Sequence, residues 1–99
     1  MARHAALTSA ELDHFLATSP DWSLEAGQLV RGATAESFPA AIGWVVAVGD
    51  AAERADHHPD IDIRWRTVTF RLSTHDAAAV TRLDVDLAHA IDEIVGSPS

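Results

Sequence analysis

Residues 53–84 decide the fold, and they read ERADHHPDIDIRWRTVTFRLSTHDAAAVTRLD. On both sides of Arg66 and Thr67, apolar residues alternate with polar ones, which is the pattern of two half-buried strands joined by a short turn. A two-residue turn at Arg66-Thr67 predicts the apolar pairs Trp65–Val68, Ile63–Phe70 and Ile61–Leu72. This register places all of them on one face and Asp62 opposite Arg71 on the other, as cross-strand pairing favours.

The same register brings histidines together at the open end of the hairpin. Extended outward, it places His58 opposite His75, with His57 beside them. Histidines at the end of a sheet are often inert surface residues, but an imidazole also donates and accepts protons near neutral pH. The cluster alone therefore leaves an inert and a functional interpretation open.

The stretch as a whole resembles the pterin-4a-carbinolamine dehydratase family. The family signature is an acidic residue, three intervening positions, His-His-Pro, an aromatic residue, a strand that ends in Thr-His, and an Asp that opens the last helix. The matching residues are Glu53, His57-His58-Pro59, Trp65, Leu72-Ser73-Thr74-His75, and Thr81 to Ala88 with Asp84 among them. The match needs no gap.

The resemblance implies a reaction: a 4a-hydroxytetrahydropterin loses water and becomes a quinonoid dihydropterin, which recycles the cofactor of aromatic amino acid hydroxylases. The leaving hydroxyl needs a proton from an acid, and a ring N–H must lose one to a base. An imidazole, with a pKa of about 6.5, can do either. On this basis we assign His57 and His75 to proton transfer, and His58 to substrate placement and secondary catalysis. The resemblance also implies a homodimer or homotetramer with no metal and no bound cofactor.

Five further residues are expected to bind the substrate: Glu53, Asp56, Pro59, Thr74 and Asp84. Glu53 and Asp56 lie at a helix end just before the histidines, where a carboxylate orients an imidazole or raises its basicity, unless that end is simply solvated. Asp84 lies on the core-facing side of the last helix, where a carboxylate is costly unless it is hydrogen-bonded. Two compatible roles stand: capping the helix with Thr81, or holding His75 or a substrate N–H at the pocket floor.

The remaining segments predict a two-layer α+β domain. The expected elements are a helix from Thr8 to Ser19, strands at 22–26 and 29–35 around a Gly27-Gln28 turn, a helix at 38–56, the hairpin described above, and a helix from Thr81 to Gly96. Thr8 and Glu11 form a capping box. We expect a four-stranded antiparallel sheet with helices on one face, in the order helix, two strands, helix, two strands, helix.

The helix at 38–56 has a wide apolar face. Residues expected to face the core recur every three or four positions: Phe38, Ile42, Val45, Val48 or Gly49, and Ala52. The surplus width, with Trp44 and Val46, is either core packing or a subunit contact. Family members often carry aromatic residues where Ala33 and Ala35 stand, so Trp44 is a candidate to fill the space.

Two more departures from the family lie near the expected site. Family members usually have Gly where Ala79 stands, and often Arg where Leu83 stands. Ala79 is expected to shift its loop slightly. Leu83 removes a charged contact to the substrate, which Arg82 is positioned to supply from another angle.

Composition limits the class of protein. The chain has 99 residues, 47% of them hydrophobic, and is expected to form a single domain over residues 1–99. Its formal charge is −8 and all its basic residues are Arg, which argues against a nucleic-acid binder. It has no cysteine. No apolar run is long enough to span a bilayer and the N-terminus lacks a signal-like core, so we expect a cytoplasmic protein with no membrane contact.

Two rival functions stand beside catalysis. The first is a binding or assembly role without catalysis, because dehydratase-like domains also serve as partner proteins in transcription and in Rubisco assembly. The second is a metal site made by His57, His58 and His75. Adjacent histidines rarely point at one ion and no cysteine is present, so we favour proton transfer over metal binding.

Overall fold

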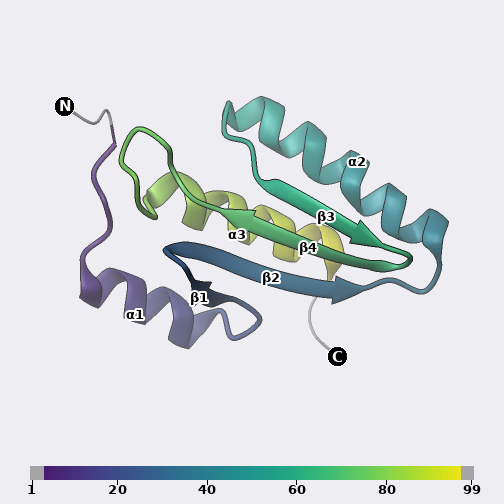
Figure 1. The fold of residues 1–99 in the computed structure, drawn as a ribbon, viewed down its shortest axis with the longest axis horizontal. Coiled ribbons are helices and arrows are strands. Elements are labelled where there is room, and N and C mark those ends of the chain that lie inside the picture. Colours follow the sequence, from purple (N-terminus) through teal and green to yellow (C-terminus); the bar gives the residue numbers. More distant parts are fainter. Residues whose placement is uncertain (1–3, 97–99) are drawn as a thin grey trace.

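The structure, a computed structural model, describes residues 4–96 and contains the predicted elements in the predicted order (Figure 1). They are α1 (Ser9–Thr18), β1 (Ser23–Glu25), β2 (Gln28–Thr34), α2 (Phe38–Ala55), β3 (Asp60–Arg64), β4 (Thr67–Leu72) and α3 (Arg82–Val95). The strands form one antiparallel sheet in the order β1-β2-β4-β3, so the second hairpin joins the first through β4. The predicted α+β class is confirmed.

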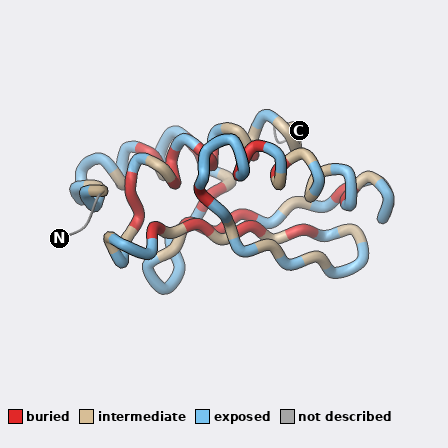
Figure 2. The backbone as a smooth tube through the Cα atoms, turned by 90° about the horizontal axis from the view of Figure 1, so that it is seen from above, coloured by how far each residue is buried: buried red, intermediate tan, exposed pale blue. Residues whose placement is uncertain are grey.

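Helices and strands form two layers, and buried segments lie between them (Figure 2). The largest fully buried apolar side chains come from both layers: Leu29, Val48, Val68, Phe70, Leu72 and Ile91. Burial of these side chains supplies the main favourable term for a domain of this size.

Both predicted capping boxes are present. At α1, the Thr8 hydroxyl accepts a hydrogen bond from the Glu11 N–H at 3.1 Å, and the Glu11 carboxylate accepts one from the Thr8 N–H at 2.8 Å. At α3, the Asp84 carboxylate accepts the Thr81 N–H at 2.8 Å, and the Thr81 hydroxyl accepts the Leu83 N–H at 3.2 Å. These bonds satisfy backbone donors that have no partner within the helix.

The register of the second hairpin differs from the predicted one. Its turn lies at Trp65-Arg66, and Ile61 pairs with Phe70 instead of Leu72. Because the shift covers two positions, one full strand repeat, every apolar strand residue keeps its predicted face. Trp65 is the exception: it lies in the turn, with a φ of 55°, and its side chain is 73% exposed.

The neighbouring strand β2 explains this shift. Thr67 pairs with Thr34 in β2, and their hydroxyl groups are 3.1 Å apart. The Ala35 N–H donates to the Arg66 carbonyl at 2.8 Å, and the Arg66 guanidinium donates to the Ala35 carbonyl at 2.9 Å. These contacts draw Thr67 into β4, so the turn moves back by one residue. The pattern of the hairpin alone does not contain them.

The turn of the first hairpin also lies one residue earlier than predicted. Ala26 and Gly27 occupy it with φ values of 52° and 77°, and Gln28 already pairs with Glu25. Positive φ at both positions matches the twist of a two-residue hairpin.

The orientation of α2 corrects the expected buried face. Phe38 and Ile42, predicted to face the core, are 48% and 40% exposed, and Val46 is 60% exposed. The buried residues of the helix are mostly small: Ala41, Val48, Ala51 and Ala52. Small side chains let α2 lie close to the rest of the core, and this turns its larger residues outward. Trp44 packs against the core half-buried, and its role as a filler beside Ala35 stays a prediction.

Candidate active site

One cleft of about 410 Å³ gathers segments that lie far apart in the sequence. It lies where α2 ends, where β3 begins and where the chain passes from β4 to α3. Its lining residues are His4, Asp56, His57, His58, Pro59, Asp60, Thr74, His75, Asp76 and Leu83. The three predicted histidines therefore line one cleft, although the ladder that was expected to place His58 opposite His75 stops short of both, because β3 begins at Asp60 and β4 ends at Leu72.

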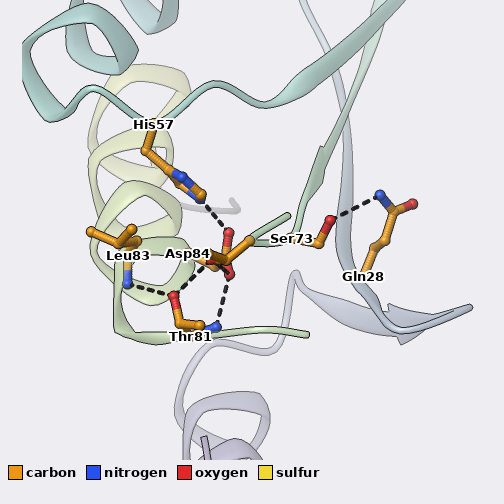
Figure 3. A network of polar contacts seen from close by, with 7 residues as sticks. Gln28, His57, Ser73, Thr81, Leu83 and Asp84 are labelled. Carbon is orange, nitrogen blue, oxygen red and sulfur yellow. Dashed lines mark hydrogen bonds and ion pairs between the residues drawn. The ribbon is translucent and has the colours of Figure 1, made fainter. Parts of the chain in front are cut away.

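Asp84 lies beneath this cleft and is fully buried. One carboxylate oxygen lies 2.5 Å from Nε2 of His57, and the other accepts hydrogen bonds from the Thr74 hydroxyl and the Thr81 N–H, both at 2.8 Å (Figure 3). The Thr81 hydroxyl lies 2.7 Å from that of Thr74, which ties the end of β4 to the start of α3. A buried carboxylate with this many donors is satisfied, so its desolvation is compensated.

The Asp84 carboxylate contacts His57, and not His75 as one prediction had it. The sequence suggested His75 or a substrate N–H, whereas the carboxylate bonds His57. When the Asp84 carboxylate is ionised it only accepts hydrogen bonds, and in that state Nε2 of His57 donates to it and Nδ1 is left to accept a proton. The tautomer of His57 is therefore set by a residue from another element, as in other carboxylate–histidine pairs.

A second carboxylate–imidazole contact lies at the end of α2. Nε2 of His58 lies 2.7 Å from the Glu53 carboxylate, and both side chains are exposed. Glu53 thus contacts an imidazole of the cleft, and its predicted role in substrate binding stays a prediction. Asp56 ends the helix in the left-handed conformation, with a φ of 50°, and turns the chain towards the two histidines. An exposed contact between a carboxylate and an imidazole adds little stability, so its main expected effect is to orient His58.

His75 belongs to a tight loop after β4. The Thr74 N–H donates to the Ala79 carbonyl at 2.9 Å, and the Ala78 N–H donates to the His75 carbonyl at 3.1 Å. The side chain of His75 is exposed at the cleft, and no residue between 4 and 96 hydrogen-bonds its imidazole. Its ring is therefore accessible to a ligand.

Sequence reasoning missed His4 among the residues of the cleft. The backbone of Leu7 donates to the Val80 carbonyl at 3.0 Å, and Ala6 pairs with Thr81 in an isolated antiparallel bridge. These contacts bring the N-terminal arm to the cleft. Neither strand nor helix periodicity signals such a bridge, so the sequence offered no sign of it.

The arrangement of the side chains bears on metal binding, and the helices bear on membrane contact. Within residues 4–96, no group of three or more His, Cys, Asp or Glu side chains is arranged to hold a metal ion. Among the helices of that same part of the chain, none has the length and apolarity to cross a membrane.

Comparisons with known proteins agree with the fold and the motif. The family model described as "Pterin 4 alpha carbinolamine dehydratase" matches residues 5–94. Proteins named "Putative pterin-4-alpha-carbinolamine dehydratase" from Nocardia farcinica and Chloroflexus aurantiacus are 54% and 52% identical, over 89% and 91% of this chain and 93% and 97% of theirs.

Two solved structures share the fold. The crystal structure of a "transcriptional coactivator/pterin dehydratase" from Brucella melitensis has a TM-score of 0.88 and 28% identity, and covers 92% of this chain and 99% of that one. A pterin dehydratase-like protein identified as a RuBisCO assembly factor has a TM-score of 0.64 and 20% identity, covers 78% of this chain and 89% of its own, and shows likeness of fold alone. From the family model and the relatives at about half identity, the chain belongs to the pterin-4a-carbinolamine dehydratase family.

Proposed function

We propose that this protein removes water from a 4a-hydroxytetrahydropterin to give a quinonoid dihydropterin by general acid–base catalysis. The observation that carries the proposal is the buried Asp84–His57 pair beside His58 and His75 in one cleft. Membership of the dehydratase family supports the substrate class. Pro59 and Thr74 shape the wall of the cleft that receives the pterin.

His57 acts as the base. Its Nε2–H is held by the buried carboxylate of Asp84, which leaves Nδ1 to take a proton from the pterin ring. The carboxylate stabilises the imidazolium that forms, because an opposite charge next to an imidazole favours its protonated state.

His75 acts as the acid. Its exposed imidazole gives a proton to the 4a-hydroxyl, the bond from carbon 4a to oxygen breaks, and water leaves. One proton is taken from the ring and one is given to the leaving group, so the reaction consumes no proton overall. His58, oriented by Glu53, helps to place the substrate.

The protein is expected to work as a homo-oligomer. Phe38, Ile42 and Val46 recur every four residues along the outer side of α2, and all three are exposed. An apolar stripe of this kind is favourable only when another surface covers it. Size-exclusion chromatography with light scattering tests this: wild type should be larger than a monomer, and Val46→Glu should reduce its size.

A role as a partner protein is the second candidate. The same exposed stripe of α2 favours it, as does the likeness to a structure described as a transcriptional coactivator as well as a pterin dehydratase. Wild-type protein that neither binds nor converts a pterin would favour this candidate over catalysis.

The test of the catalytic proposal is a dehydration assay of wild type, His57→Ala and His14→Ala. His14 is exposed on α1 and does not line the cleft, so it is a matched control of the same residue type. His57→Ala should lose about 10²–10⁴-fold in kcat, whereas His14→Ala should match wild type. A His57→Ala protein with wild-type kcat would remove His57 from the mechanism.

A further inference from the structure

The N-terminal arm, residues 4–7, holds a fourth imidazole at the cleft. The arm is fixed by the Leu7–Val80 backbone hydrogen bond, by the Ala6–Thr81 bridge and by the side chain of Leu7, which packs against the core. Figure 1 shows this segment running beside the loop that precedes α3. His4 therefore lies only two residues from an anchored backbone position, and its place at the cleft is set by the fold.

His4 also lies at the boundary between the cleft and an adjoining hollow. It is half-buried and lines the cleft together with Leu83, and the same two residues line a neighbouring hollow of about 380 Å³. A substituent that projects from a bicyclic ligand in the cleft towards this hollow passes His4. Leu83 is apolar and offers no hydrogen bond there.

Arg82 does not supply the polar contact that Leu83 lacks. It lines the hollow but not the cleft, and its guanidinium donates to Asp86 at 3.1 Å. His4 lines the cleft beside Leu83, and its imidazole is able to hydrogen-bond a ligand there. Within residues 4–96, nothing hydrogen-bonds the His4 imidazole, a group that can both donate and accept hydrogen bonds.

Resting on the proposed function, we propose that His4 is a substrate-binding residue that hydrogen-bonds the polar substituent of the pterin at the mouth of the cleft. A hydrogen bond there contributes to affinity. It transfers no proton, because both proton transfers of the proposed mechanism are assigned to His57 and His75.

The test compares His4→Ala and His4→Gln with wild type and with His14→Ala. Kd is measured for biopterin by isothermal titration, and KM and kcat are measured for dehydration. His4→Ala should raise Kd and KM about three- to tenfold, the range expected for one lost hydrogen bond, and leave kcat within about twofold. His4→Gln should recover part of the loss, since its amide still hydrogen-bonds. Neither melting temperature should change.

Four outcomes overturn the proposal. An unchanged Kd in His4→Ala, while wild type binds biopterin, rejects it and leaves the proposed function standing. A fall in kcat with an unchanged KM rejects a binding role. Wild type that binds no pterin rejects the proposed function and this inference with it. As a direct check, the ring signals of His4 in an NMR titration should shift on addition of biopterin, and unshifted signals would also reject the contact.

Discussion

Asp84→Asn separates the structural role of this residue from its catalytic one. The substitution keeps the shape of the side chain and removes its charge. In the structure, one oxygen faces Nε2 of His57 and the other accepts from Thr74 and Thr81. If the Asn oxygen keeps the two threonine contacts, its NH₂ group faces His57. His57 must then accept at Nε2 and carry its proton on Nδ1, which removes the base from the cleft.

The two threonine contacts set the cost in stability. A hydrogen bond to a charged group is worth about 1.5–3 kcal/mol and one between neutral groups about 0.5–1.5 kcal/mol. Each of the two bonds is therefore weakened by about 1–1.5 kcal/mol, and Asp84→Asn is expected to lose about 2–3 kcal/mol in the free energy of unfolding. For a domain of this length, each kcal/mol lowers the melting temperature by roughly 4–8 °C. The protein should remain folded at 25 °C, so its turnover can be compared with that of wild type at this temperature.

The loss in catalysis should be much larger. A general base with the wrong tautomer forfeits most of the roughly 10²–10⁴-fold that proton transfer contributes, so kcat should fall at least tenfold. Asp86→Asn is the control: it removes a carboxylate from the first turns of the same helix, but that carboxylate is exposed and pairs with Arg82. Its kcat should equal that of wild type.

The assay is dehydration of 4a-hydroxytetrahydropterin, normalised to the folded fraction from circular dichroism. If Asp84→Asn has a much lower melting temperature while its folded molecules convert the substrate at the wild-type rate, Asp84 is a structural residue. The mechanism described for His57 is then refuted.

Three further predictions concern the acid, the absence of a metal requirement and the helix cap. His75→Ala should lower kcat about 10²–10⁴-fold with little change in melting temperature, because its side chain is exposed and lies in a loop; a variant within about twofold of wild type excludes His75 as the acid. Turnover should survive prolonged treatment with a chelator, since the proposed steps are proton transfers; stoichiometric zinc together with chelator-sensitive turnover would reject this mechanism. The pKa of Glu11 is lowered, mainly by the hydrogen bond from the Thr8 backbone and also by that from the Thr8 side chain. The stability that this carboxylate adds is therefore present above its unfolded pKa and is lost as pH falls through its folded pKa. Glu11→Gln should lose that acid-dependent part in thermal melts, and an identical pH dependence in both proteins would contradict it.

The strands and their faces followed from the sequence, but the register did not. Alternation fixes which side chains point inward, because its period equals that of a strand. It does not fix which residues form the turn, since a shift of two positions preserves every face. That choice was made by Thr34 at the end of β2 and by Ala35 just after it, about thirty positions before the turn.

The histidines that line the cleft were predictable from the motif. Their hydrogen-bonding partners were predictable only in part. The Thr81–Asp84 capping box is local in sequence, so its spacing reveals it. The contact of Asp84 with His57 spans two elements and depends on how α3 packs under the end of α2. His4 reaches the cleft through a single bridge between irregular segments, which leaves no periodic pattern in the sequence.

The central claim is that this cleft dehydrates a 4a-hydroxytetrahydropterin, and the kinetics of the wild-type protein test it most directly. The substrate is generated in solution by a pterin-dependent hydroxylase, and the formation of quinonoid dihydropterin is followed by absorbance with and without the protein. We predict a rate that rises above the spontaneous reaction and saturates with substrate. A rate equal to that of the spontaneous reaction at every protein concentration would contradict the claim.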